Sequence, residues 1–247
     1  MSLLLLHARY QFLETIRVPI AVIGTVGFPA LFMLLFVVSN PAVGGEPAAA
    51  TLAAGQMSLF AVISAYMFNL GAGVAEDRAK PWHAHLRTLP VGPAAQLGGR
   101  LLNAQCFALL SLIPVALTAM LFTRAHASAG ELAAVLLALL LAGLPFAFMG
   151  LAIGYSLPLK AAIPVVQLLL LPMAFAGGLF LPPVLFPDWL DVLSHALPTR
   201  AVRDLVIGAL TNTAPGVVAP LVAAGWTLVL GTLAVVAHRR DEGRRFR

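Results

Sequence analysis

Ionisable side chains are missing from the interiors of six long hydrophobic stretches of this 247-residue chain. Only 10% of the residues are charged and 60% are hydrophobic, whereas about 25% of the residues in a soluble domain are charged. Ion-driven carriers and intramembrane proteases keep ionisable groups at membrane depth to bind protons or to perform chemistry. Their absence argues against both classes and indicates that any transport draws its energy from elsewhere. The stretches are 18–38, 51–75, 101–123, 131–155, 161–187 and 216–237.

Motifs for catalysis and for nucleotide or metal binding are also absent. The chain has no GxxxxGK[ST] phosphate-binding loop, no GxSxG nucleophile and no HExxH metal motif. His83 and His85 are two residues apart, so a helix would point them to different faces, unlike the i, i+4 pair of a zinc site. The single Cys106 cannot form an intrachain disulfide. We therefore expect no catalytic, cofactor-binding or metal site on this chain.

What the chain does have is six apolar segments of membrane-spanning length. About 20 helical residues cover a hydrocarbon core of about 30 Å. Runs such as Leu132–Leu141 are continuously apolar, whereas the strands of a membrane barrel would alternate. The predicted fold class is an all-α integral membrane protein with six transmembrane helices. They form one transmembrane domain over 1–247, with spans one and two in 18–75, spans three to five in 101–182 and span six at 216–237.

The basic residues are distributed unevenly between the connections. If the N-terminus is cytoplasmic, 12 of the 15 Lys and Arg residues lie inside and three lie outside. Cytoplasmic loops of membrane proteins carry this excess, so we predict that both termini are cytoplasmic. Arg outnumbers Lys thirteen to two, which is typical of bacterial genomes rich in G and C, and the predicted location is the cytoplasmic membrane of a bacterium. The net charge of +5 then reflects topology, and no nucleic-acid partner is expected. The outer group is Arg124, Arg200 and Arg203, and the inner group is Arg9, Arg17, Arg78, Lys80, Arg87, Arg100, Lys160, Arg239, Arg240, Arg244, Arg245 and Arg247.

The two ends of the chain are interpreted as lying at the inner surface. Residues 1–17 form a predicted interface helix, because Leu6, Tyr10, Leu13 and Ile16 share one face of a helix. The alternative is that this segment simply extends span one. Residues 238–247 form a basic cytoplasmic tail.

The longest predicted cytoplasmic connection covers residues 76–100. Pro81 suits the first turn of a short helix that runs to Leu89. Trp82, Leu86 and Leu89 recur at i, i+4 and i+7 and make one apolar stripe in an otherwise polar segment. That stripe requires a partner, either lipid or another protein.

Residues 183–215 lie outside in this topology but are too apolar for a solvated loop. Pro187-Asp188 and Pro198-Thr199 are typical of helix starts. We predict two short helices that re-enter the outer leaflet, because irregular backbone at such a turn is tolerated where protein buries it or water lines it. The alternative is a soluble extracellular helical hairpin.

The run from Ala176 to Leu210, AGGLFLPPVLFPDWLDVLSHALPTRAVRDLVIGAL, resembles the membrane permease of ABC-2 type exporters. The cytoplasmic stretch from Glu76 to Pro90 and the layout of the whole chain resemble the same family. That family carries a basic residue late in its second outer helix; Val206 stands at that position here, and Arg203 is basic but out of register. The matching residues are Gly177, Gly178, Phe180, Pro182, Pro187, Trp189, Leu197, Pro198 and Thr199.

The resemblance implies two permease subunits, as a homodimer or related heterodimer, and a separate nucleotide-binding ATPase subunit. ATP and magnesium would then bind the partner, and this chain would not be an enzyme. The first cytoplasmic connection would be the coupling helix that docks on the ATPase, with apolar anchors and charges that set orientation. The residues carried over to this role are Glu76, Asp77, Arg78, Trp82, Leu86, Arg87 and Leu89.

Cargo is expected to pass between the protomers along a route without charges, which favours hydrophobic or amphiphilic molecules such as drugs or lipids. Export of a polysaccharide or glycolipid is an alternative, although only 8% of the residues are aromatic and could stack on sugars. A non-transporting scaffold or immunity-type membrane protein is a further alternative. The residues expected to line the route are Phe60, Tyr66, Phe68, Asn69, Phe175 and Phe180.

Overall fold

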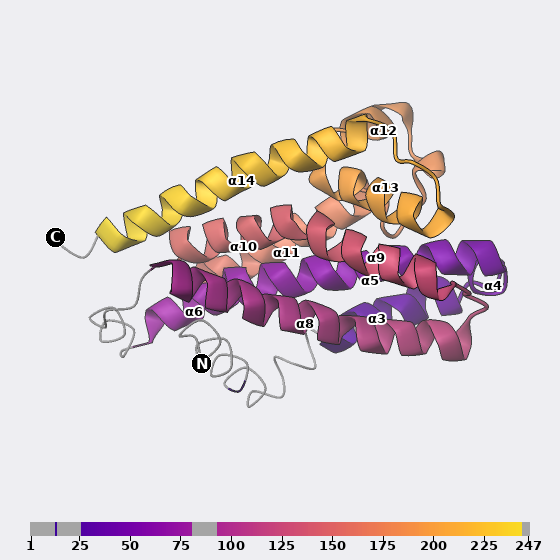
Figure 1. Cartoon of the computed structure of the whole chain (residues 1–247), viewed down its shortest axis with the longest axis horizontal. Coiled ribbons are helices and arrows are strands. Elements are labelled where there is room, and N and C mark those ends of the chain that lie inside the picture. Colours follow the sequence, from indigo (N-terminus) through magenta and orange to yellow (C-terminus); the bar gives the residue numbers. More distant parts are fainter. Residues whose placement is uncertain (1–12, 14–25, 81–92, 244–247) are drawn as a thin grey trace.

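The computed structural model describes residue 13, residues 26–80 and residues 93–243, and within them every regular element is a helix. The long helices lie side by side along the longest axis of the molecule (Figure 1). The ends of α6 and α14 and the beginning of α8 lie at one end of this bundle, while α4, α12 and α13 lie at the other (Figure 1).

Five helical segments are long and apolar enough to cross a membrane. The second predicted span is one continuous helix made of α5 (Pro47–Tyr66), the π-helical η3 (Met67–Ala72) and α6 (Gly73–Ala79). The others are α8 (Pro93–Phe122), α9 with α10 (Ala129–Ala142 and Leu144–Ser156), α11 (Leu159–Ala176) and α14 (Val218–Gly243).

The first predicted span is described only in part. It contains α3 (Phe28–Met33) and the π-helical η2 (Leu34–Val38), which together form a shorter apolar helix. Residues 18–25, and the interface helix predicted for 1–17 apart from Leu13, lie outside the described residues. The count of six spans therefore stays a prediction, whereas a helical protein with multiple spans is established.

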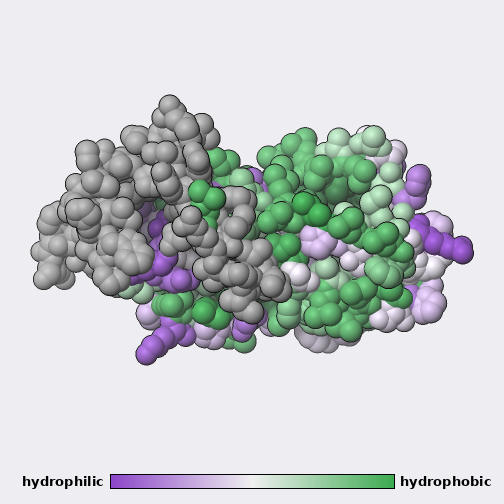
Figure 2. Space-filling view, turned by 90° about the horizontal axis from the view of Figure 1, so that it is seen from below, coloured by the Kyte–Doolittle hydropathy of each residue, from purple (hydrophilic) through white to green (hydrophobic). Residues whose placement is uncertain are grey.

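The surface of the bundle is apolar where a soluble protein would be polar. Leu121, Leu168 and Leu228 are each more than 70% exposed. Figure 2 shows hydrophobic residues over most of the described surface of one face, with hydrophilic residues gathered toward its ends. An apolar surface of this kind is suited to lipid, because its exposure to water would be unfavourable.

Three helix boundaries differ from the sequence prediction. α6 continues to Ala79 and α8 begins at Pro93, so both ends of the predicted loop 76–100 are helical. The fifth span was predicted to reach residue 182, but α11 ends at Ala176. Gly178 adopts φ of 80° immediately afterwards, a conformation that glycine permits and that commonly terminates helices.

Small residues allow close contact between the second and fourth spans. A Cβ atom built on Gly154 would lie 2.4 Å from the Leu70 carbonyl oxygen, and one on Gly150 would lie 3.0 Å from the Tyr66 carbonyl oxygen. α10 packs against η3 on one side and against α14 on another. The GxxxG pair of α10 therefore serves packing within the chain.

At the opposite end, two short helices begin where the sequence predicts them. α12 covers Asp188–Ser194 with Pro187 before it, and α13 covers Pro198–Thr211. A 3-10 turn, η4 (Pro183–Leu185), precedes them, and α4 (Pro41–Gly44) lies at the same end. α13 is packed against α5, α9 and α14 (Figure 1), whereas Trp189, Val192 and Leu193 of α12 are exposed. The apolar, exposed α12 is compatible with the predicted re-entry into the outer leaflet, which stays a prediction.

Candidate functional site

Arg78, at the end of the second span, joins three parts of the bundle. Its Nε and Nη2 atoms donate to Asp241 Oδ1 on α14 at 2.9 and 2.6 Å. Its Nη1 atom donates to the carbonyl oxygens of Gly154 and Leu157, at 2.8 and 3.1 Å, where α10 ends and turns toward α11. The side chains of Arg78 and Asp241 are only 17% and 7% exposed. This single guanidinium therefore connects α6, α14 and the end of α10.

Asp77 extends the connection to α8. One carboxylate oxygen accepts from Lys80 Nζ at 2.9 Å, and the other lies 3.1 Å from Arg100 Nη1. Arg100 belongs to α8, so the ion pair joins the helix before residues 81–92 to the helix after them. We call the set Asp77, Arg78, Lys80, Arg100 and Asp241 the inner charge network, after the cytoplasmic side on which the sequence prediction places this end of the bundle.

The predicted coupling residues thus divide into three groups. Glu76 is exposed and available to a partner. Asp77 and Arg78 hold contacts inside the chain, and their predicted contact with the ATPase stays a prediction. Asp241 was not singled out from the sequence; the signal that could have found it is an acidic residue among the arginines of the tail. Trp82, Leu86, Arg87 and Leu89 lie outside the described residues.

The predicted route residues divide as well. Phe60, Phe175 and Phe180 lie together, with ring centroids 4.9 Å apart for Phe60 and Phe180 and 4.8 Å apart for Phe175 and Phe180. Phe32 and Phe36 complete this aromatic cluster, with centroids 5.0 and 5.2 Å from that of Phe180. Phe60 is buried beneath the cluster, and Phe175 is 45% exposed at its surface.

Phe32 and Phe36 were missed, although a signal for them was present. With Phe28 they recur every four residues, which aligns three rings along one side of a helix. The ring of Phe28 lies 5.1 Å from that of Phe32, so the series runs directly into the cluster.

The other predicted route residues lie apart from the aromatic cluster. The Tyr66 phenol is buried and donates to Gln105 Oε1 on α8. Asn69 donates to its own helix, to the Ala65 carbonyl oxygen at 2.9 Å, and both Asn69 and Phe68 are half-buried. Tyr66 therefore contributes to the contact between α5 and α8 in this conformation and does not line an open surface.

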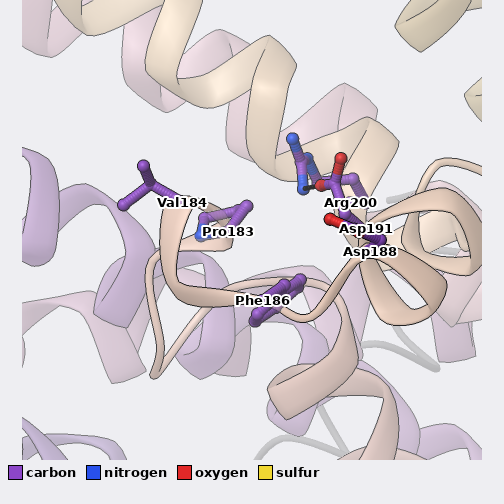
Figure 3. Close-up of a pocket in the computed structure, with 6 residues that line it drawn as sticks. All are labelled: Pro183, Val184, Phe186, Asp188, Asp191 and Arg200. Atoms are coloured by element: carbon purple, nitrogen blue, oxygen red, sulfur yellow. Dashed lines mark hydrogen bonds and ion pairs between the residues drawn. The ribbon is translucent and has the colours of Figure 1, made fainter.

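A second set of charges lies on α12 and α13, which form the hairpin predicted to be on the outer side and called the outer hairpin below. Arg200 donates to Asp204 Oδ2 at 3.1 Å, Asp191 Oδ1 at 3.3 Å and Ser194 Oγ at 3.1 Å, and so joins α12 to α13. Figure 3 shows Arg200 beside Asp191 in a surface pocket, with Asp188, Pro183, Val184 and Phe186 around it.

The four hairpin residues that the family resemblance pointed to lie at the starts of α12 and α13. Pro187 precedes α12, Trp189 is exposed, and Pro198 and Thr199 are buried at the start of α13. A Cβ atom on Gly177 would lie 2.2 Å from Thr199 Oγ1, so the start of α13 rests directly on the end of α11.

Arg203, which the family pattern left without a role, anchors α13 to the spans. Its Nε donates to the Gly178 carbonyl oxygen at 3.0 Å and its Nη1 to Asp204 at 2.8 Å. Gln56 of α5, with its amide oxygen turned toward Arg203, accepts from Nη2 and Nε at 2.9 and 3.0 Å. Burial lowers the pKa of Arg203 and the Asp204 carboxylate opposes that shift, so the guanidinium stays charged.

Replacing Arg203 by methionine should lower the stability of the protein by about 1–3 kcal/mol, because buried acceptors on Gly178 and Gln56 lose their donor. The measurement is the thermal unfolding midpoint of the protein in detergent. Arg124→Met is the matched control, since the Arg124 side chain is exposed at the same end of the bundle. Equal midpoints for the two variants would contradict the anchoring role.

Three features of the described residues offer surfaces for contact. Within residues 26–80 and 93–243, no group of three His, Cys, Asp or Glu side chains is arranged to hold a metal ion. The features of interest are the inner charge network beside residues 81–92, the aromatic cluster on spans one, two and five, and the anchored outer hairpin.

Comparison with known proteins agrees with this layout. The family model described as "ABC-2 type transporter" matches residues 3–211. A curated relative from Bacillus subtilis (strain 168), "Putative transport permease YvfS", is 24% identical over 143 residues, which is 58% of this chain and 58% of that protein. The match thus spans little more than half the length of the relative.

Proposed function

Because the chain belongs to the ABC-2 type transporter family, we propose that it is the permease subunit of an exporter driven by a separate nucleotide-binding subunit. The observation that carries the proposal is the position of the inner charge network. Asp77 and Arg78 precede residues 81–92, Arg100 follows them, and all three are bound to other helices. A displacement of residues 81–92 by a partner would therefore be transmitted through these contacts to α6, α8, α10 and α14.

In this proposal residues 81–92 contain the coupling helix, with Trp82, Leu86 and Leu89 as apolar anchors and Glu76 and Arg87 as orienting charges. Closure of two ATP-loaded partner subunits would move two permease copies between inward-facing and outward-facing arrangements. Rigid helices linked by ion pairs transmit such movements as units. Both termini and residues 81–92 would then lie on the cytoplasmic side of a bacterial membrane.

The proposed cargo is a hydrophobic or amphiphilic molecule, such as a drug or a lipid. The aromatic cluster supports this, because Phe175 and Phe36 present apolar rings at the surface and residues 161–187 carry no ionisable side chain. A charged cargo would require a compensating charge at this depth.

The division of labour is testable by reconstitution. Vesicles that contain this chain and its nucleotide-binding subunit should move a lipophilic fluorescent dye when ATP is supplied, and the purified chain alone should hydrolyse no ATP. Dye movement driven by a proton gradient without ATP would contradict the proposal, as would ATP hydrolysis by the chain alone.

Trp82→Ala should weaken binding of the nucleotide-binding subunit roughly 10-fold or more, because a buried aromatic anchor dominates such interfaces. ATP hydrolysis should become uncoupled from dye movement, while the unfolding midpoint stays unchanged. Trp189→Ala is the matched control, since this tryptophan is exposed at the other end of the bundle. The binding constant of the two purified subunits is the measurement. Identical constants for both variants would show that Trp82 is not an anchor.

A further inference from the structure

Gln167 places a side-chain amide on the outside of a membrane span. It lies at the centre of α11, Leu159–Ala176, roughly 12 Å from either end at the helical rise of 1.5 Å per residue. The side chain is exposed. Four other amides in the described parts of the spans are buried or half-buried: Gln56, Asn69, Asn103 and Gln105.

An exposed amide at this depth requires a polar environment. In hydrocarbon its donors and acceptor would go unpaired, and burying an unpaired polar group is unfavourable. A glutamine side chain is too short to reach the interface from the centre of a span. The hydroxyl groups of Thr118, Thr227 and Thr232 avoid this difficulty by donating to carbonyl oxygens of their own helices. Gln167 has no such bond among the described residues, so a partner for its amide has to come from outside them: water, a polar ligand or a second copy of the chain.

The same side of α11 leads to the aromatic cluster. Phe175 follows Gln167 by eight residues, which places it about 80° around the helix and two turns closer to the outer end. Its ring contacts those of Phe180 and Phe36, with centroids 4.8 and 6.5 Å away. Gln167 and Phe175 thus both lie on the exposed face of α11, about 80° apart, and this face with the rings of Phe36 and Phe180 is called the strip below. Residues 161–187 add no charge to it.

Resting on the proposed export function, we propose that Gln167 is a specificity-determining residue that selects uncharged amphiphiles with a hydrogen-bonding group. The amide binds that group, and Phe36, Phe175 and Phe180 contact the apolar part of the cargo. A hydrogen bond to Gln167 and an apolar contact with the rings, at a fixed separation, favour a molecule with an uncharged polar head group and an apolar chain over a pure hydrocarbon. They also disfavour a cation or anion, which would find no counter-charge on the strip.

The first test measures access of water to Gln167 without any cargo. Gln167→Cys and the control Leu228→Cys, exposed near the middle of α14, are made in a Cys106→Ser background. A membrane-impermeant, cationic methanethiosulfonate reagent reacts with thiolates, which form in water, so Gln167→Cys should react about 10-fold or more faster than the control. Equally slow reaction would overturn the proposal. Spontaneous disulfide formation between two Gln167→Cys copies would also overturn it, because the amide would then be covered by a second copy.

The second test measures selectivity in vesicles that contain both subunits. The probes are three pyrene-labelled chains that end in a glycerol ester, a trimethylammonium group or a methyl group. The wild-type protein should carry the glycerol ester fastest, and Gln167→Leu should slow that probe about 10-fold relative to the methyl-ended one, because an unpaired hydroxyl would remain in the complex. Unfolding midpoints of both proteins check that the variant is folded.

The outcomes separate the two proposals. If the wild-type protein moves no probe with ATP, the export function itself fails. If it moves the probes but Gln167→Leu slows all of them equally, or none, export stands and the selective role of Gln167 is wrong.

Discussion

Replacing Arg78 by methionine should destabilise the protein by about 3 kcal/mol or more, because the buried Asp241 carboxylate would lose its ion pair with Arg78. The carbonyl oxygens of Gly154 and Leu157 would lose their donor in the same step. The unfolding midpoint of the protein in detergent measures the loss. Arg239→Met is the control, since Arg239 is an exposed arginine on α14.

A conservative variant and a double variant sharpen this prediction. Arg78→Lys keeps the positive charge but loses the planar guanidinium, whose nitrogens bond to Asp241 and two carbonyl oxygens at once. We therefore expect a loss of stability smaller than that of Arg78→Met. Arg78→Met combined with Asp241→Asn should cost less than the sum of the two single changes, because the two residues share one interaction. An Arg78→Met variant as stable as Arg239→Met would show that the inner charge network contributes little to stability.

In the proposed exporter, the same change should also reduce transport beyond its effect on stability. Arg78 ends the helix that leads into residues 81–92 and ties it to α14 and α10. If this link transmits movement from the nucleotide-binding subunit, Arg78→Met protein that remains folded at low temperature should still bind that subunit but move dye more slowly. Unchanged transport by the folded variant would place the transmission elsewhere.

Gly154→Ala should lower the stability of the protein by about 1–3 kcal/mol, or prevent folding altogether, although it adds only one methyl group. The added Cβ would lie 2.4 Å from the Leu70 carbonyl oxygen and 2.9 Å from that of Gly71. Both obstacles are backbone atoms, so α10 and the second span would have to separate. The yield of monodisperse protein in detergent and its unfolding midpoint are the measurements.

Gly225→Ala provides the matched control for this change. Gly225 is also a helical glycine within a candidate span, but nothing lies within 4 Å of its added Cβ. Alanine has a higher helix propensity than glycine by up to about 1 kcal/mol, so this variant should be neutral or slightly more stable. If Gly154→Ala behaves like Gly225→Ala, the close contact between α10 and the second span is wrong.

Much of the helical layout could be predicted from local sequence, because the signals are local. Apolar length predicts the spans, and Pro187-Asp188 and Pro198-Thr199 predict the starts of α12 and α13. The ends of helices were less predictable. α11 stops at Ala176 because Gly177 and Gly178 permit a turn there, whereas hydrophobicity alone continues through Leu181.

The candidate site was predictable only where its residues are close in sequence or share a period. Phe28, Phe32 and Phe36 are regularly spaced, and Phe175 and Phe180 are close in the sequence. Asp241 is 163 residues from Arg78, and no local pattern relates the two. That Asp77 and Arg78 contact a partner stays a prediction, and their ion pairs to α8 and α14 within the chain were not foreseen.

By itself, then, the amino-acid sequence determined the class of the protein, its apolar spans and its lack of charges at membrane depth, because these depend on composition along a single helix. The tertiary structure decided which polar groups are satisfied and which are not. It buries Arg78 against Asp241 and leaves the Gln167 amide exposed, although both side chains are simply polar residues in the sequence. The reason is that burial and pairing depend on which helices pack together, and distant parts of the chain determine that jointly.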